Sequence, residues 1–282
     1  MNEMLVSAPA ARAERAAFPD LLRQWRMERR MSQLGLATEA GISTRHLCFL
    51  EKGRSQPSRE MVVLLASVLD IPLAAQNALL IAAGFAPVFS EAPLDAPQLG
   101  HVQQALEFML AQQEPFPALV VDEAWNLRHR NMAATRILGA LRPFYNVPAE
   151  LSQNVMHVMC HPGGMRRFMP NWHDFVAAYL QVLHREATQG LSHAAARLRE
   201  DLLRYPDMPA AFGAGGNDSP VVPMQLQIGK HALSFFVTLT TFAMPRDITL
   251  QQIKIEGFFP ADEITAQLAR KLAAEPDFSL LD

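Results

Sequence analysis

Three side chains that can bind metal ions or take part in catalysis, His157, Cys160 and His161, lie within five residues of one another. Two histidines four residues apart share one face of a helix, and the cysteine adds a further ligand. A metallopeptidase helix needs a glutamate directly after its first histidine, and Val158 occupies that position. A structural zinc site needs a fourth ligand at a fixed spacing, and the nearest, His173, follows a Pro-Gly-Gly break. The spacing therefore excludes hydrolysis by that route.

The same stretch also has the features of an ordinary helix end. A helix through Val155 and Val158 is expected to end at His161, because a proline and two glycines follow, and such residues are typical after a last turn. A histidine near a helix C-terminus also complements the helix dipole. The residue types alone leave both interpretations open.

The rest of the chain offers no other catalytic pattern. It contains no Ser-His-Asp arrangement, P-loop or dinucleotide fingerprint. The acidic residues of the C-terminal half are expected at scattered, solvent-facing positions, which argues against a pair of carboxylates acting as acid and base. We predict a protein that is not an enzyme and holds no metal or cofactor. A metal- or haem-binding sensor or enzyme that uses His157 and His161 is the alternative.

The charge of the chain limits its partners. The 282 residues carry a formal net charge of −3, which excludes a protein wrapped in nucleic acid over its whole surface. Residues 1–90 hold 10 basic and 8 acidic residues and carry +2, whereas the remainder holds 15 and 20 and carries −5. An anionic partner is therefore expected at the N-terminal third.

Length and cysteine content indicate a two-domain cytoplasmic protein. Half of the residues are apolar, which is enough for two domains with a core each. The two cysteines, Cys48 and Cys160, form no CxxC pair. The first 17 residues lack the pattern of a secretory signal, and the chain has no run of 18 apolar residues.

Composition divides the chain into four parts. Residues 1–17 have no sustained apolar stripe and are predicted to be a flexible tail. Residues 18–85 show a helical period with breaks at Gly, Pro and Asp, which predicts five short helices. Residues 86–100 are proline-rich and predicted to be a linker. Residues 101–275 are predicted to form the second domain, which also mediates dimerisation.

The second domain shows the element order of an α+β fold. Strands are predicted over 117–122 and 125–130, followed by a helix over 131–138, and apolar residues recur at helical spacing over 172–187. Alternating residues on both sides of the turn Gly229-Lys230 predict a hairpin, and residues 253–259 supply a further strand. We therefore predict an all-α N-terminal domain of five helices and an α+β C-terminal domain, in which helices cover an antiparallel sheet.

Residues 31–58 carry the strongest functional signal. Ser32 is placed to cap a helix that stops at Gly41, and Ser43 is placed to cap the next helix. Leu47 and Leu50 form the buried stripe of that second helix. Small residues on the first helix permit a close approach, as a helix-turn-helix needs.

The outward-facing start of the second helix has side chains that can read DNA. In the major groove Arg45 can reach the O6 and N7 atoms of guanine, and the methyl group of Thr44 can touch a thymine methyl. Between residues 23 and 59 there are 8 basic and 3 acidic residues, a local charge of +5. Gln33 can donate to a phosphate, and His46 suits a phosphate as well as a base. The predicted DNA-binding residues are Gln33, Ser43, Thr44, Arg45, His46, Lys52 and Arg54.

This segment resembles the Xre or lambda-repressor-like helix-turn-helix family. The resemblance rests on SQ at 32–33, AGIS at 40–43, LEKG at 50–53 and PS at 57–58. One departure is Gly35, where relatives often carry a charged residue. Glycine weakens a helix interior by up to about 1 kcal/mol, and by less near its end.

The remaining chain, from FPALVVDEAWNLRHRN through NVMHVMCHPGGMRRFMPNW to LTTFAMPRDITLQQIKIEGFFPAD, is similar to the MmyB-like, PAS-like ligand-binding domain. The resemblance implies a small apolar ligand of the fatty-acid type. It also implies a pocket between the helices and the sheet, in which His157 is one possible polar anchor. The predicted ligand-binding residues are Trp125, His157, Phe168, Trp172, Phe175, Tyr179 and Phe235.

The sequence thus predicts a transcription regulator that binds double-stranded operator DNA. Two copies would place their recognition helices about 34 Å apart, which predicts a homodimer on an inverted-repeat operator. An alternative is that the second domain is only an assembly module and binds no small molecule.

Overall fold

The computed structural model describes residues 17–188, 192–209 and 221–274. The chain divides into two compact units, Met1–Val88 and Phe89–Asp282, each with a hydrophobic core of its own. The tail predicted for residues 1–17 lies outside the described residues, except for Ala17.

The described part of the first unit consists of five helices, as predicted. They are α1 (Phe18–Glu28), α2 (Gln33–Glu39), α3 (Thr44–Glu51), α4 (Arg59–Val68) and α5 (Leu73–Ala82). Three of them begin at a serine whose hydroxyl accepts a hydrogen bond from a backbone amide of the first turn, namely Ser32, Ser43 and Ser58. Such caps satisfy amide groups that have no partner inside the helix. The predicted capping roles of Ser32 and Ser43 are therefore confirmed.

The second unit is α+β, as predicted. Its helices are α6 (Gly100–Gln112), α7 (Met132–Leu141), α8 (Val155–Cys160), α9 (Trp172–Thr188), α10 (His193–Leu202), α11 (Ile248–Gln252) and α12 (Glu263–Ala274). Short 3-10 turns lie at η1 (Pro97–Leu99), η2 (Arg142–Phe144), η3 (Ala149–Leu151) and η4 (Met165–Phe168). Helices α6, α10, α11 and α12 were not expected from the sequence.

Five strands form one antiparallel sheet in the order β2-β1-β5-β4-β3. They are β1 (Ala118–Val121), β2 (Leu127–Arg130), β3 (Met224–Ile228), β4 (His231–Thr240) and β5 (Lys254–Pro260). The predicted hairpin is confirmed, with Leu226 opposite Leu233 across β3 and β4. Strand β2 begins later than expected, because Trp125 has a φ of 64° and its amide donates to the Asp122 carbonyl, which closes a turn.

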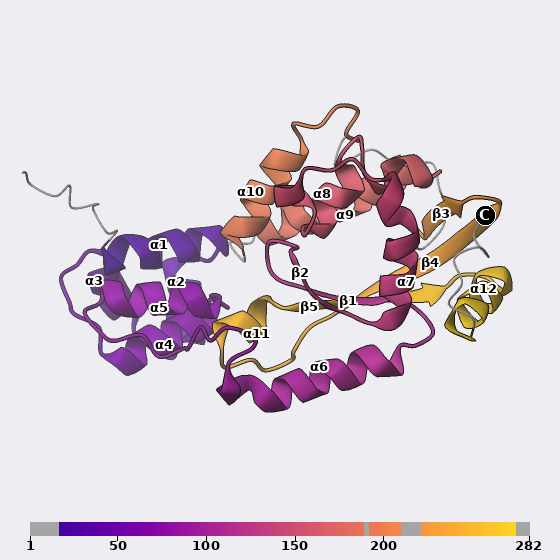
Figure 1. Cartoon of the computed structure of the whole chain (residues 1–282). Coiled ribbons are helices and arrows are strands. Elements are labelled where there is room, and N and C mark those ends of the chain that lie inside the picture. The colour runs from indigo at the N-terminus through magenta and orange to yellow at the C-terminus, as the bar shows by residue number, and fades with distance from the viewer. Residues whose placement is uncertain (1–16, 189–191, 210–220, 275–282) are drawn as a thin grey trace, which may run out of the picture. The chain divides into compact units, whose positions relative to one another are not determined.

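Helices lie on both faces of the sheet (Figure 1). Leu106 and Leu110 of α6 pack against Val120 and Ile255 on one face. The larger core lies on the other face, where residues of α7, α8, α9 and α12 meet inward-facing residues of every strand. This second face of the sheet also forms one side of a pocket. Within the described residues no helix is both long and apolar enough to cross a bilayer.

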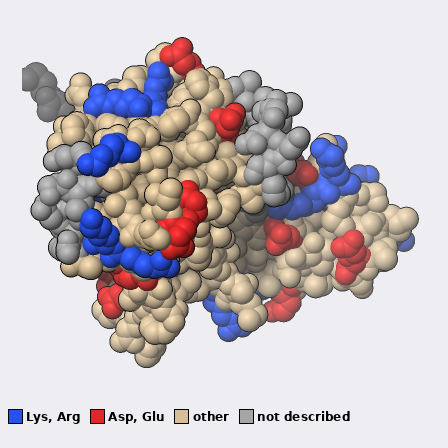
Figure 2. Space-filling view, turned by 90° about the vertical axis from the view of Figure 1, so that its right-hand side faces the viewer, with Lys and Arg blue, Asp and Glu red and all other residues tan. Residues whose placement is uncertain are grey.

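Charge alone does not mark a binding site on the face shown in Figure 2. Lys and Arg side chains are interspersed with Asp and Glu there, and most of that face is uncharged.

Candidate functional site

Helix α3 exposes its first turn and buries its opposite face. The Ser43 hydroxyl accepts a hydrogen bond from the His46 amide at 3.1 Å. Thr44 and Arg45 are exposed, His46 is half-buried and Leu47 is fully buried. The side chains open to a partner are thus those of the first turn, as in a recognition helix.

A short turn sets the angle between α2 and α3. Gly41 has a φ of +66°, which L side chains rarely adopt. The Ile42 amide donates to the Ala37 carbonyl at 2.9 Å. Ala37 and Ala40 are both buried in the core of the unit, so small side chains lie where the two helices approach each other.

A part-buried ion pair connects α3 to α1. The Arg26 guanidinium donates to both Glu51 carboxylate oxygens, at 2.6 and 2.9 Å, and the two side chains are 12% and 3% exposed. The Gln33 side-chain amide donates to the same carboxylate at 2.7 Å. Burial alone would raise the pKa of Glu51, but the hydrogen bonds from Arg26 and Gln33 outweigh it and the pKa is lowered. The carboxylate therefore stays ionised, and it holds the reading helix in place.

Sequence reasoning missed this pair. The only available signal was LEKG at 50–53, which marked a family resemblance but not the role of its glutamate. Glu51 and Arg26 are 25 positions apart in the sequence. Hydrophobic periodicity predicts local helices and strands and gives no information on contacts at that separation.

The predicted DNA-binding residues differ in how free their side chains are. The exposed ones are Ser43, Thr44, Arg45, Lys52 and Arg54. The Arg45 guanidinium lies 5.3 Å from the ring centre of Phe49 in the same helix. The Gln33 amide is bound to Glu51, so only its second N–H is available to a phosphate.

The second unit contains an apolar cavity of about 330 Å³ on the inner face of the sheet. This volume lies at the lower end of the range for small-molecule pockets. It is too large for a packing defect, because protein cores contain few voids larger than a water molecule. Its apolar walls come from α7, α8 and the sheet and include Leu119, Ile137, Val158, Leu226, Phe235 and Phe258.

Of the seven predicted ligand-binding residues, only Phe235 lines the cavity. The six that do not are Trp125, His157, Phe168, Trp172, Phe175 and Tyr179. Most of these are core residues beside the cavity, and the ring centres of Trp125 and Tyr179, for example, lie 5.3 Å apart. The helical spacing predicted the buried face of α9 correctly, but burial does not distinguish a filled core from a cavity wall. These six side chains therefore do not line this cavity, and their role in ligand binding stays a prediction.

The histidines around α8 make contacts inside the protein. His157 Nδ1 lies 2.8 Å from the Tyr205 hydroxyl, and His161 Nδ1 accepts a hydrogen bond from the Gly163 amide at 3.0 Å. Burial lowers the pKa of His157 and raises that of Cys160 to about 12. No group of three His, Cys, Asp or Glu side chains within the described residues is placed to hold a metal ion. Helix α8 ends at Cys160 with His161 as its C-cap, as the interpretation of a helix end predicted.

The two glycines after His161 allow a close backbone approach. A Cβ atom on Gly163 would lie 2.4 Å from the Asn146 carbonyl oxygen, and one on Gly164 would lie 2.0 Å from that of Val158. The Asn146 amide donates to the Gly163 carbonyl at 2.7 Å. Only glycine fits at these two positions. The glycines therefore allow the segment after η2 to lie against the end of α8, and this places Tyr145 at the cavity.

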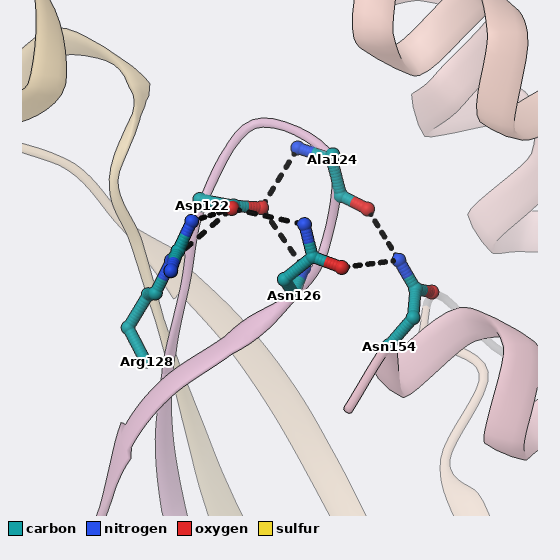
Figure 3. A network of polar contacts seen from close by, with 5 residues as sticks. All are labelled: Asp122, Ala124, Asn126, Arg128 and Asn154. Carbon is teal, nitrogen blue, oxygen red and sulfur yellow. Dashed lines mark hydrogen bonds and ion pairs between the residues drawn. The ribbon is translucent and has the colours of Figure 1, made fainter. Parts of the chain in front are cut away.

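A polar network fastens the start of α8 to the turn between β1 and β2 (Figure 3). The Asp122 carboxylate accepts hydrogen bonds from the amides of Ala124 and Asn126 at 2.9 Å and pairs with Arg128 at 2.7 Å. The Asn154 side-chain amide donates to the Ala124 carbonyl at 2.6 Å and to Asn126 Oδ1 at 3.1 Å. Asn154 is also the N-cap of α8, so one residue positions a cavity wall relative to the sheet.

The expectation that the acidic residues of this unit face solvent was wrong for Glu256 and Asp247, both of which are buried. Glu256 accepts a hydrogen bond from the Tyr179 hydroxyl at 2.6 Å, and burial raises its pKa to about 7. Asp247 accepts hydrogen bonds from the Ser90 hydroxyl at 2.5 Å and the Ala92 amide at 3.2 Å. Donors supplied by distant parts of the chain make this burial possible.

The first unit contains a helix-turn-helix in which the first turn of α3 is exposed, and the second is an α+β unit with an apolar cavity. Together they define a DNA-binding regulator with a ligand-binding domain. Residues 102–272 match the family described as MmyB-like transcription regulator ligand binding domain, and residues 22–76 match a helix-turn-helix family. The chain belongs to the MmyB-like transcription regulators.

Among curated proteins none matches the chain. A solved structure described as that of an RNA-binding light-oxygen-voltage receptor is similar over 93% of this chain, with 12% sequence identity and a TM-score of 0.25. The present chain covers 64% of that structure, which is less than two thirds of its length.

Proposed function

We propose that the protein is a cytoplasmic, homodimeric transcription regulator that binds an inverted-repeat operator through α3 and responds to a small apolar ligand of the fatty-acid type. The observation that carries the proposal is the exposed first turn of a helix whose other face is fully buried and whose end is fixed by the Glu51 ion pair. A rigid reading helix of this kind can hold side chains against base edges without losing much conformational entropy.

Base reading is assigned to Arg45 and Thr44. The Arg45 guanidinium can donate two hydrogen bonds to one guanine, and the Thr44 methyl can contact thymine. Gln33, Ser43, His46, Lys52 and Arg54 are assigned to phosphates, which position the helix without reading sequence. The affinity should fall by roughly one log unit per log unit of salt for each phosphate neutralised.

The ligand is proposed to act from the cavity of the second unit. Its apolar walls suit a hydrocarbon chain, and its volume of about 330 Å³ suits a small molecule. Binding would favour one arrangement of the two reading helices of the dimer. It can do so only to the extent that the ligand binds that arrangement better than others.

Two substitutions of Arg45 test the DNA-reading role. Wild-type protein would first select its operator from a pool of random duplexes, and the affinities of the variants for operator and random DNA would then be compared at fixed salt. Arg45→Ala should lose discrimination by about 1–3 kcal/mol, which is the value of one bidentate contact. Arg45→Lys keeps the charge but not the planar fork, so it should lose discrimination while retaining its affinity for random DNA.

The outcome against the proposal is also defined. If both variants discriminate as well as the wild type, Arg45 contacts only the backbone or solvent. If the wild type selects no sequence at low ionic strength, with or without ligand, the proposal of an operator-binding regulator fails.

A further inference from the structure

Helix α3 carries a phenylalanine that the core of the first unit does not use. Phe49 lies four residues after Arg45, and the two positions share the helix face opposite the buried Leu47 and Leu50. The Phe49 side chain is half-buried. Among the described residues of this unit, it belongs neither to the hydrophobic core nor to the side chains packed against it. Core packing therefore does not account for this aromatic ring.

The Phe49 ring instead contacts the Arg45 guanidinium. The Cζ atom of Arg45 lies 5.3 Å from the ring centre, which is within the distance at which an aromatic ring attracts a cation. Helical side chains lean toward the N-terminus of their helix, so the Phe49 ring covers the turn from which Arg45 projects. The ring thus restrains a long side chain that is otherwise exposed.

A second pair in the same unit has the same spacing but uses its arginine differently. The Arg29 guanidinium lies 5.3 Å from the ring centre of Trp25. Its N–H groups donate to the carbonyls of Leu69 and Asp70, both at 2.7 Å, so this arginine connects the end of α1 to the end of α4. The Arg45 guanidinium makes no hydrogen bond or ion pair with any residue that the structure describes.

Contact with a ring leaves the edge of a guanidinium open. The ring attracts the group through its flat face, whereas the N–H donors lie in the plane of the group and point outward. Arg45 is therefore restrained without losing the two donors that a bidentate contact with guanine needs. A side chain that is already ordered also loses less rotamer freedom when it binds.

We propose that Phe49 is a positioning residue of the reading helix, whose ring holds the Arg45 guanidinium in the orientation that donates to one guanine of the operator. The inference rests on the proposed function, in which Arg45 reads that guanine, and adds the residue that makes the reading selective. The ring acts through Arg45 and reads no base itself.

The first test uses the full-length protein without DNA. Nitrogen-15 relaxation of the Arg45 Nε–Hε group reports how far this side chain is ordered on the picosecond-to-nanosecond timescale. Phe49→Leu should lower its order parameter toward the range of flexible groups, below about 0.6, whereas Phe49→Tyr keeps the aromatic face and should match the wild type. Both variants should melt close to the wild-type temperature, because Phe49 is not packed against the core.

The second test measures base preference on the operator that the wild type selects. The guanine read by Arg45 is the one whose replacement by adenine weakens binding of the wild type but not of Arg45→Ala. At that position Phe49→Leu should reduce the preference for guanine by about threefold to tenfold, as expected for a lost cation–π contact, and keep the affinity for random DNA. Phe49→Tyr should retain the preference. In the Arg45→Ala background, Phe49→Leu should have no further effect.

The results that would overturn the proposal can be told apart. If Phe49→Leu keeps the wild-type preference for guanine, the ring does not position Arg45 for reading, whatever its effect on the order parameter. If Phe49→Leu changes base preference equally with and without the Arg45 side chain, the ring contacts DNA itself and the positioning role is refuted. If the wild type selects no sequence at all, the proposed function fails, and the positioning role fails with it.

Discussion

The two units of the chain differ in how many of their buried polar side-chain atoms lack a hydrogen-bond partner. In the helical unit the buried Glu51 carboxylate is paired with Arg26 and hydrogen-bonded to Gln33. In the second unit six buried side-chain atoms have no hydrogen-bond partner among the described residues, whereas the described part of the first unit has none. They belong to Trp125, Arg136, Tyr145, Arg199, His231 and Glu256.

This difference matches the different tasks assigned to the two units. A reading helix needs one fixed orientation, and a fully satisfied polar pair helps to specify it. A sensor must gain free energy when its ligand binds, and a buried polar atom without a partner provides such a gain when binding supplies one. The comparison therefore predicts that removal of the paired Glu51 carboxylate is costly in the first unit, whereas removal of an unpartnered group such as the Tyr145 hydroxyl is harmless or favourable in the second.

The largest expected effect is on the first unit. Glu51→Ala leaves the Arg26 guanidinium without its counter-ion. Because the pair is only part-buried, the cost should lie below the about 3–5 kcal/mol that the loss of one partner costs in a fully buried pair. Hydrogen exchange followed by mass spectrometry on the full chain should show reduced protection in peptides from residues 18–82. Peptides from residues 100–274 should be unaffected, since the two units have separate cores.

A double variant serves as the control. Arg26→Met combined with Glu51→Leu replaces the pair by apolar side chains of similar size, and it should recover most of the lost protection. Wild-type protection in the single variant would mean that the pair contributes nothing to the rigidity of α3.

The next effect concerns Glu256 and the pH dependence of stability. Burial raises its pKa from an ordinary value of 4.5 to about 7, so the folded state binds the proton more tightly than the unfolded state. The contribution of Glu256 to stability is then fully present below about pH 4.5 and is lost as the pH rises through about 7. A shift of this size corresponds to about 3 kcal/mol.

Glu256→Gln isolates this contribution. Glutamine stays neutral, and its carbonyl oxygen can still accept the hydrogen bond of the Tyr179 hydroxyl. The free energy of unfolding in urea, measured from pH 5 to pH 8, should fall more steeply for the wild type than for the variant. Parallel curves would show that the Glu256 carboxyl titrates normally, for example because Lys254 keeps it ionised.

The sequence predicted the positions of the helices and strands more accurately than the residues that line the cavity. Serine caps and leucine spacing located α2 and α3, and strict alternation around Gly229 located the β3–β4 hairpin, because both signals are local. Tyr145 lies between the 3-10 turns η2 and η3, where no periodicity exists, so nothing in the sequence marked it as a cavity residue. Its position depends on Gly163, which lies 18 positions along the chain.

The ligand-binding residues were predicted from their expected burial. A side chain can be buried either because it fills the core or because it lines a cavity. Spacing along α9 correctly indicated that Trp172, Phe175 and Tyr179 are buried, yet these side chains fill the core instead of lining the cavity. Whether a buried residue meets a neighbour or a void depends on the relative placement of several elements. Glu256 was missed for the same reason, because its burial requires the distant Tyr179 hydroxyl.

The smallest effect tests whether the cavity is retained for binding at the expense of stability. Val158 of α8 lines the cavity, and Val158→Phe would fill part of it with a ring. Cavity filling commonly adds about 0.5–2 kcal/mol, so differential scanning calorimetry should show a rise of a few degrees in the melting temperature of the second unit. The affinity for dodecanoic acid should drop at least tenfold in the same variant. As a control, Ile264→Phe enlarges an exposed side chain of α12 and should change neither the melting temperature nor the affinity. A Val158→Phe protein that is less stable and still binds the acid would show that the cavity is neither rigid nor the ligand site.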